Sequence, residues 1–305
     1  MAEHSFVNFF FGLFPNSLLF GGAVRDYITG NKPDDFDFLF PSQSRYPAYQ
    51  LLNQMGIIQK IQFDPLTDTI HVPRESWVSY PPDGVIIRLT LLWDTKSVQV
   101  DLFSDTTLAY LQSTSLDFLC NCLTLSHNGT IGVRESTIPR FYNNQMIDEW
   151  RIPMIKRRML LLAMDDIRNK TARPATLGYY QPIGVKRVGL KAIHFMEKGW
   201  KIGGIIVPFV VANTRVINKE ICCICHTNAT KKEKVIRMVC QHELHMDCFK
   251  QLLEKFQGVL RCPLCRKETS FYAKENQDNY LEDILHQSVV YCEENKDSNA
   301  PPQVS

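Results

Sequence analysis

The pattern of apolar and polar residues predicts strands at three places in the first third of the chain. Residues 17–20 form a short apolar run, and residues 35–40 and 97–105 alternate with a period of two. Side chains two positions apart on a strand share a face, so Asp35 and Asp37 should point the same way. The phenylalanines between them should point into a core.

Other patterns predict helices and a docking segment. Residues 21–30 carry glycines at both ends, which indicates a tight turn and a short helix, and the apolar-rich stretch 154–169 predicts a buried helix. Residues 205–212 predict a buried strand or a docking segment, and Pro208 makes a central strand unfavourable. An amphipathic helix is expected over residues 271–292, followed by a disordered tail.

The composition is that of an ordinary globular protein of 305 residues, with 45% apolar and 22% charged residues. Residues 5–24 are uncharged and about as long as a membrane span. Polar residues and a proline interrupt this run, and it leads directly into Arg25 and Asp26. We therefore expect no membrane anchor. Six of the ten cysteines have zinc-ligand spacing, and no cleavable signal peptide precedes them, which favours an intracellular, cytoplasmic or nuclear protein that is not secreted.

Charge is unevenly distributed along the chain. Residues 1–150 contain 9 Lys+Arg against 16 Asp+Glu, whereas residues 151–204 contain 12 against 3. This basic segment could face a polyanion such as RNA, or it could be the solvated surface of helices. The sequence leaves both interpretations open.

Eight potential soft metal ligands fall within 44 residues near the C-terminus, in a segment too short to bury a core of its own. They are Cys222, Cys225, Cys240, His242, His245, Cys248, Cys262 and Cys265. Cysteine and histidine at such spacing are typical zinc ligands. The neighbouring Cys223 lies outside the Cys-x2-Cys spacing and is expected to be a bystander.

This spacing resembles the RING finger of the two-histidine type. The resemblance implies interleaved sites, in which Cys222, Cys225, His245 and Cys248 hold one zinc and Cys240, His242, Cys262 and Cys265 hold the other. Both ions would be tetrahedral and closed, so they would be structural and not catalytic. Their binding energy, on the order of 10 kcal/mol each, would be the folding energy of the module.

RING fingers of this kind act as ubiquitin ligases by binding a ubiquitin-loaded conjugating enzyme. The resemblance implies that Ile224 and Pro263 belong to the groove for the conjugating enzyme and that Arg266 bridges this enzyme and ubiquitin. A multidentate arginine suits that role. Leu252 stands where many members of the family have a tryptophan.

A second candidate site lies near the N-terminus, where Asp35 and Asp37 would repel each other unless a cation relieved them. Carboxylates suit magnesium, and the glycine pair Gly21–Gly22 would let backbone and a helix N-terminus approach phosphate. With Arg25, these residues resemble the opening of the class II nucleotidyltransferase head found in CCA-adding enzymes and bacterial poly(A) polymerases.

Further segments match that family less fully. Asp101 could be its third carboxylate. Residues 115–123 match at Asp117 and Asn121 but lack the family's two arginines, and Asp148 with Arg151 fits either its base-reading pair or an ordinary ion pair at i,i+3.

These patterns together predict an α+β protein. We expect a nucleotidyltransferase-like head with a mixed sheet at 1–150, a basic helical neck and connector at 151–215, a cross-braced two-zinc RING at 216–272, and a helix and tail at 273–305. The favoured function is a RING-type ubiquitin ligase that binds conjugating enzyme and ubiquitin, with the head as its substrate-, RNA- or nucleotide-binding part. The alternative is a template-independent nucleotidyltransferase with two magnesium ions on Asp35 and Asp37.

Overall fold

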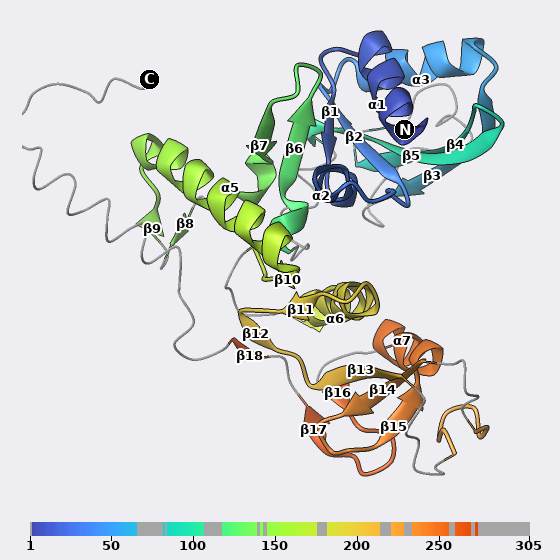
Figure 1. Ribbon diagram of the computed structural model, residues 1–305, viewed down its shortest axis with the longest axis vertical. Helices are drawn as coiled ribbons and strands as arrows, with labels where there is room; N and C mark the ends of the chain where they lie inside the picture. The colour runs from blue at the N-terminus through green and yellow to red at the C-terminus, as the bar shows by residue number, and fades with distance from the viewer. Residues whose placement is uncertain are drawn as a thin grey trace, which may run out of the picture.

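The computed structural model describes most of the chain and has the predicted α+β architecture (Figure 1). The described residues are 2–65, 82, 84–106, 118–138, 141–142, 145–175, 182–213, 221–228, 234–255, 260–269 and 272–273. A sheet-containing head is followed by two long helices and a small C-terminal module, and α6 lies between the head and that module. Beyond residue 273, the expected helix and tail lie outside the described residues.

The head is built on a mixed sheet with the strand order β3-β4-β5-β2-β1-β6-β7. Its strands are β1 (Leu18–Phe20), β2 (Phe36–Phe40), β3 (Ile58–Pro65), β4 (Val85–Trp93), β5 (Lys96–Ser104), β6 (Leu123–Ser126) and β7 (Ile131–Val133). In this sheet β2 and β5 are parallel, whereas the other neighbouring strands are antiparallel. The three strands predicted from the sequence pattern are β1, β2 and β5.

Two helices, α1 (Ala2–Leu13) and α3 (Arg45–Gln54), contribute buried side chains to the head core. Phe10 of α1 is fully buried and stacks on Phe38 of β2 with 3.8 Å between ring centroids. Phe6 packs against Phe36 of the same strand in a tilted arrangement, with 5.0 Å between ring centroids. The uncharged N-terminal run therefore supplies core residues. No helix in the described part of the chain is long and apolar enough to cross a bilayer.

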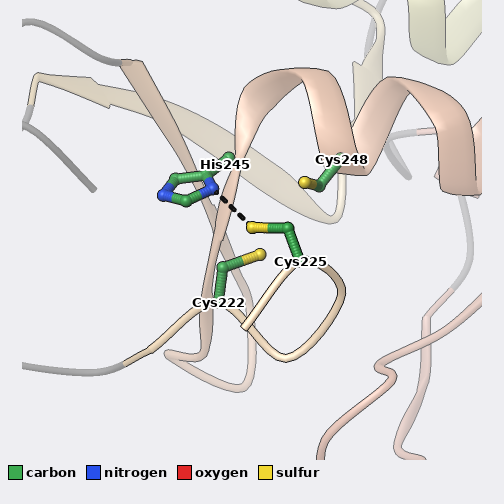
Figure 2. A group of neighbouring side chains, drawn as sticks. All are labelled: Cys222, Cys225, His245 and Cys248. Carbon is green, nitrogen blue, oxygen red and sulfur yellow. Dashed lines mark hydrogen bonds between the residues drawn. The ribbon is translucent and has the colours of Figure 1, made fainter. Parts of the chain in front are cut away.

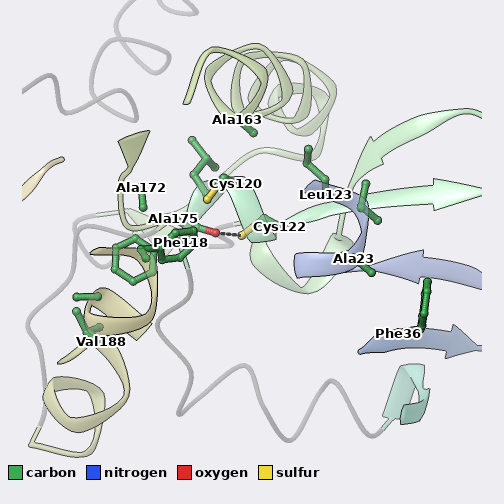
Figure 3. Packing of buried hydrophobic residues seen from close by; sticks show 14 of the residues in the cluster. Ala23, Phe36, Phe118, Cys120, Cys122, Leu123, Ala163, Ala172, Ala175 and Val188 are labelled. Atoms are coloured by element: carbon green, nitrogen blue, oxygen red, sulfur yellow. Dashed lines mark hydrogen bonds between the residues drawn. The ribbon is translucent and has the colours of Figure 1, made fainter. Parts of the chain in front are cut away.

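A short 3-10 helix, η2 (Leu119–Asn121), lies where several elements converge (Figure 3). Around it are α2 (Gly22–Thr29), α5 (Ile152–Asn169) and β10 (Thr171–Ala172). Cys120 and Cys122 are fully buried there, and the Cys122 thiol donates to the carbonyl oxygen of Phe118 at 3.4 Å. Both cysteines serve apolar packing, as the sequence predicts.

The connector consists of α5, α6 (Pro182–Glu197) and the parallel pair of β10 with β11 (Lys201–Ile202). The helix predicted at 154–169 is confirmed, but it is buried along one face only. Ile155 and Met159 are fully buried, whereas Leu161 is 56% exposed. Smaller elements precede α5: η3 (Glu135–Thr137), β8 (Phe141–Tyr142), β9 (Gln145–Met146) and η4 (Glu149–Arg151).

The C-terminal module is a three-stranded sheet, β13-β14-β15, with one helix. Its elements are β13 (Phe209–Asn213), β14 (Lys234–Met238), β15 (Glu243–His245), α7 (Met246–Glu254), β16 (Leu260–Arg261) and β17 (Glu268–Thr269). β13 is the predicted docking segment, and it pairs at the edge of the sheet because Pro208 precedes it. β12 (Ile205–Ile206) pairs with β18 (Tyr272–Ala273), so Ala273 ends a strand and does not begin a helix.

Truncating the stacked phenylalanine of α1 tests the head core. We expect Phe10→Ala to lower the free energy of unfolding by about 3–5 kcal/mol, because it removes a buried ring and leaves a cavity. The control Asn8→Ala, on the exposed side of the same helix, should change it by less than about 0.5 kcal/mol. Urea unfolding followed by tryptophan fluorescence measures both. Equal losses in the two variants would contradict this account of α1.

Candidate metal centre

Two Cys-x2-Cys loops in the C-terminal module have the same backbone structure. In the first, the Cys222 N–H donates to the Thr227 carbonyl at 3.0 Å, and the His226 N–H donates to the Cys222 carbonyl at 2.7 Å. The second loop repeats both bonds, from Cys262 to Lys267 at 3.0 Å and from Arg266 to Cys262 at 2.8 Å. The sequence spacing alone gives these loops their shared shape.

Each loop turns back through a residue in the left-handed region. His226 has φ 58° and Arg266 has φ 59°, although neither is a glycine. Such a conformation costs on the order of 1 kcal/mol for a residue with a Cβ. The turn brings both cysteines of each pair to one side, where their sulfur atoms can share a ligand.

The first group of potential ligands is Cys222, Cys225, His245 and Cys248, whose ligand atoms all lie within 4.8 Å of one another. Figure 2 shows the three thiols and the imidazole pointing toward a common centre. The Cys225 sulfur lies 3.1 Å from Nδ1 of His245. His245 ends β15 and Cys248 lies in the first turn of α7, so the sheet and the helix both contribute to the group.

The second group is Cys240, His242, Cys262 and Cys265, which meets the same spacing. Nδ1 of His242 lies 3.4 Å from the Cys240 sulfur and 3.5 Å from the Cys262 sulfur. Cys240 and His242 flank the turn between β14 and β15. The two groups therefore alternate along the chain, in the interleaved order that the RING resemblance implies.

The protonation of the thiols fits a site that needs a cation. The hydroxyl of Thr227 lowers the pKa of Cys225 to about 6, whereas burial raises the pKa of Cys248 to about 12. Likewise, a backbone hydrogen bond from Lys267 lowers the pKa of Cys265 to about 7, and burial raises that of Cys262 to about 11. Three neighbouring thiols cannot all ionise without a compensating cation. The donor set of soft sulfur and imidazole fits zinc.

The predicted partner-binding residues lie around the same loops. Pro263 and Arg266 are exposed, and Ile224 is partly buried. Among the described residues, no hydrogen-bond or ion-pair partner of the Arg266 guanidinium is found. The structure adds Ile221 and Leu264, which are 54% and 45% exposed. Their positions beside the cysteines were the only sequence signal for them.

The head carboxylates are brought together in part. Asp37 on β2 is directly opposite Asp101 on the parallel strand β5. Burial, and after it the charges of Asp35 and Asp101, raises the pKa of Asp37 well above its usual range. Burial raises the pKa of Asp101 to about 6, against the effect of Arg88, whose Nε lies 3.2 Å from its carboxylate. Within the described residues, only the two Cys/His groups bring three or more ligand atoms within 4.8 Å.

Residues of the glycine-rich turn have structural contacts. Gly21 has φ 79°, and a Cβ at this position would lie 3.0 Å from Oδ2 of Asp37, so a side chain is excluded there. Gly22 begins α2. The Arg25 side chain is 3% exposed, and its guanidinium is engaged by Asp26 and Asn121. Two cations far away in the sequence, Arg134 and Lys191, lower the pKa of Asp37 electrostatically, which no sequence motif indicated.

The remaining family-like positions are ordinary or lie outside the description. Nε of Arg151 lies 3.2 Å from Asp148, as expected for an ion pair at i,i+3, and its guanidinium lies over the Trp150 ring. Asp117 lies outside the described residues.

Comparison with known proteins gives a family for the C-terminal module. Residues 220–266 match the family model described as "Ring finger domain". No curated protein sequence is significantly similar to the chain.

Solved structures resemble the chain at low identity. A Thermotoga maritima CCA-adding enzyme complexed with tRNA is 14% identical, covering 65% of this chain and 39% of its own, with a TM-score of 0.36. A CCA-adding enzyme with ATP is 15% identical, covering 65% and 37%, with a TM-score of 0.37. A tRNA-processing enzyme with CTP is 17% identical, covering 61% and 40%, with a TM-score of 0.34. The chain thus spans about two fifths of these proteins. Residues 220–266 are thus similar to the RING finger family.

Proposed function

We propose that the protein is a RING-type ubiquitin ligase whose C-terminal module holds a ubiquitin-loaded conjugating enzyme. The observation that carries this proposal is the pair of interleaved Cys/His groups, each with four convergent ligand atoms. Filled by zinc, each site would be closed to substrate. The metals would then shape a binding surface and take no part in bond making.

The surface that they shape has the chemistry needed to bind a protein. The two loops expose an apolar set comprising Ile221, Pro263 and Leu264 beside the exposed Arg266. Apolar contact would hold the conjugating enzyme, and Arg266 would donate hydrogen bonds to carbonyl oxygens of that enzyme and of ubiquitin. The substrate amine then attacks the thioester, the amide bond forms, and the thiolate of the conjugating enzyme leaves.

Under this proposal the head selects what is modified. Its sheet places Asp37 and Asp101 side by side, and the basic residues of the connector follow in the chain. The basic connector would attract an anionic ligand such as RNA, a nucleotide or an acidic protein.

A second candidate function is template-independent nucleotidyl transfer. The parallel register of Asp37 and Asp101 favours it, because neighbouring carboxylates with raised pKa values are relieved by a divalent cation. Magnesium held by Asp35, Asp37 and Asp101 would neutralise charge on a transferring nucleotidyl group. The RING would then serve as an interaction module.

The zinc proposal predicts a difference between adjacent cysteines. Cys222→Ser should lose one zinc ion per chain and unfold much of the module, because the ligand has no replacement. Cys223→Ser should keep both ions, since Cys223 belongs to neither group. Elemental analysis of the purified chains, together with chelator titration followed by circular dichroism, measures the outcome. Equal zinc contents in the two variants would rule out this ligand assignment.

The ligase proposal predicts a specific role for Arg266. Arg266→Ala should slow ubiquitin discharge from the conjugating enzyme by about tenfold to a hundredfold, the loss of one or two charge-assisted hydrogen bonds. Arg261→Ala, which removes an exposed arginine paired with Glu268 in the same module, is the matched control and should leave the rate unchanged. A panel of charged conjugating enzymes with free lysine as acceptor provides the assay. If the wild-type protein promotes no discharge, or if Arg266→Ala leaves the discharge rate unchanged, the proposal is contradicted.

The second candidate predicts magnesium-dependent incorporation of labelled nucleotide into RNA. This activity should disappear in the variant with Asp35→Ala and Asp37→Ala, and it should fall below about pH 6, where Asp101 takes up a proton and loses its affinity for the cation. Asp94→Ala, at an exposed turn of the same sheet, is the control. Wild-type protein that incorporates no nucleotide would exclude the candidate.

A further inference from the structure

Helix α6 lies between the head and the RING module and contributes to the packing of both (Figure 1). A single cluster of buried apolar residues includes Phe38 of the head, Phe195 of α6, and Phe209 and Phe249 of the module. A flexible linker would leave each part with a separate core. The shared core indicates a fixed arrangement.

On the head side, the contact between α6 and the head is centred on Arg25. Its Nε and Nη2 donate to the two carboxylate oxygens of Asp26, both at 2.9 Å, and its Nη1 donates to Oδ1 of Asn121 at 2.8 Å. Its Cζ lies 5.1 Å from the ring centre of Phe195 and 5.4 Å from that of Trp200. A planar guanidinium can make these contacts together, whereas a lysine ammonium cannot.

Two neighbouring residues at the end of α6 form ion pairs with different parts of the protein, one with the head and the other with the module. The Lys198 ammonium lies 2.8 Å from the Asp34 carboxylate and 3.9 Å from that of Asp26, both in the head. The Glu197 carboxylate lies 3.3 Å from Lys250 on α7 and 3.6 Å from Lys234 on β14, both in the module. The end of α6 therefore joins the two parts through ion pairs as well as through the core.

On the module side, α6 contacts both α7 and β13, and β13 is itself held firmly in the module. Phe209 of β13 packs against Phe249 of α7 with ring centroids 4.9 Å apart. β13 also pairs with β14 over five residues, so the segment that follows the connector is fixed in the sheet of the RING. Backbone pairing of this kind sets a direction as well as a distance.

We infer that the head and the RING module form one rigid body joined through α6, and that Arg25 is a positioning residue that sets where the RING holds ubiquitin relative to the head. The second half of this inference rests on the proposed ligase function, whereas the rigid arrangement does not. A fixed geometry gives a high effective concentration of the thioester at a few lysines only. Which lysines are modified then depends on the geometry that the connector fixes, as well as on which substrate the head binds.

Rigidity is tested with two dyes on the zinc-loaded full chain, attached through non-natural amino acids at the exposed positions Asn53 of α3 and Gln251 of α7. Single-molecule energy transfer should give one narrow distribution for the wild type. Arg25→Lys, which cannot keep all the contacts of the guanidinium, and Glu197→Lys, which repels Lys234 and Lys250, should each broaden it. A broad wild-type distribution, or two unchanged variants, overturns the rigid body.

Control measurements on the same samples show whether each variant is folded. Zinc content and circular dichroism report whether each variant keeps its module and its head, and the exchange of Asp94→Lys with Lys96→Glu alters exposed charges away from the connector without changing the net charge. Because Glu197 lies at the surface of α6, its variant remains informative if Arg25→Lys disrupts the head.

The positioning role is tested with a charged conjugating enzyme by mapping the modified lysines of the chain itself. In the loosened variants, discharge onto free lysine should keep its wild-type rate, while transfer to the preferred lysines falls by about tenfold and spreads to others. An unchanged map with normal discharge overturns the positioning role. Absent discharge in the wild type overturns the ligase function instead, and the dye experiment still decides the rigid body.

Discussion

A buried guanidinium fixes the arrangement on which the rest of the structure depends. An uncompensated charge in a protein interior costs several kcal/mol, so the surroundings of Arg25 must supply both a countercharge and acceptors. Asp26 provides the countercharge and Asn121 a further acceptor, while aromatic rings from the connector cover the flat face. Because these partners come from α2, η2 and the end of α6, one side chain determines how three elements meet.

Several features could be predicted from the sequence because their signals are local. Alternating phenylalanines indicate β2 at 36–40. Glycines flank α2 on both sides, and Gly30 ends the helix at its C-cap in the left-handed region. The eight cysteine and histidine positions indicate the two groups, since short loops bring each Cys-x2-Cys pair together whatever the rest of the chain does. Local spacing therefore predicted the two ligand groups of the RING module, but not its strands β14 and β15 or its helix α7.

Other features depend on contacts between distant residues. Arg25 and Asn121 are 96 positions apart, and Glu197 and Lys250 are 53 positions apart. A motif suggests that Arg25 could serve a nucleotide, but the motif does not reveal that Phe195 and Trp200 cover it. The position of Asp101 beside Asp37 likewise follows from the parallel crossover between β2 and β5. Periodicity predicts a strand, but it does not predict which strand will be its neighbour.

The pairing of β12 with β18 has a consequence for how such a protein could arise. Ile205 and Ile206 precede the RING, Tyr272 and Ala273 follow it, and the two segments lie side by side as antiparallel strands. The chain therefore enters and leaves the module at one point. A segment with adjacent ends can be exchanged between host proteins without separating the elements that flank it. The contacts that the module makes with α6 would then have to be supplied by a new host.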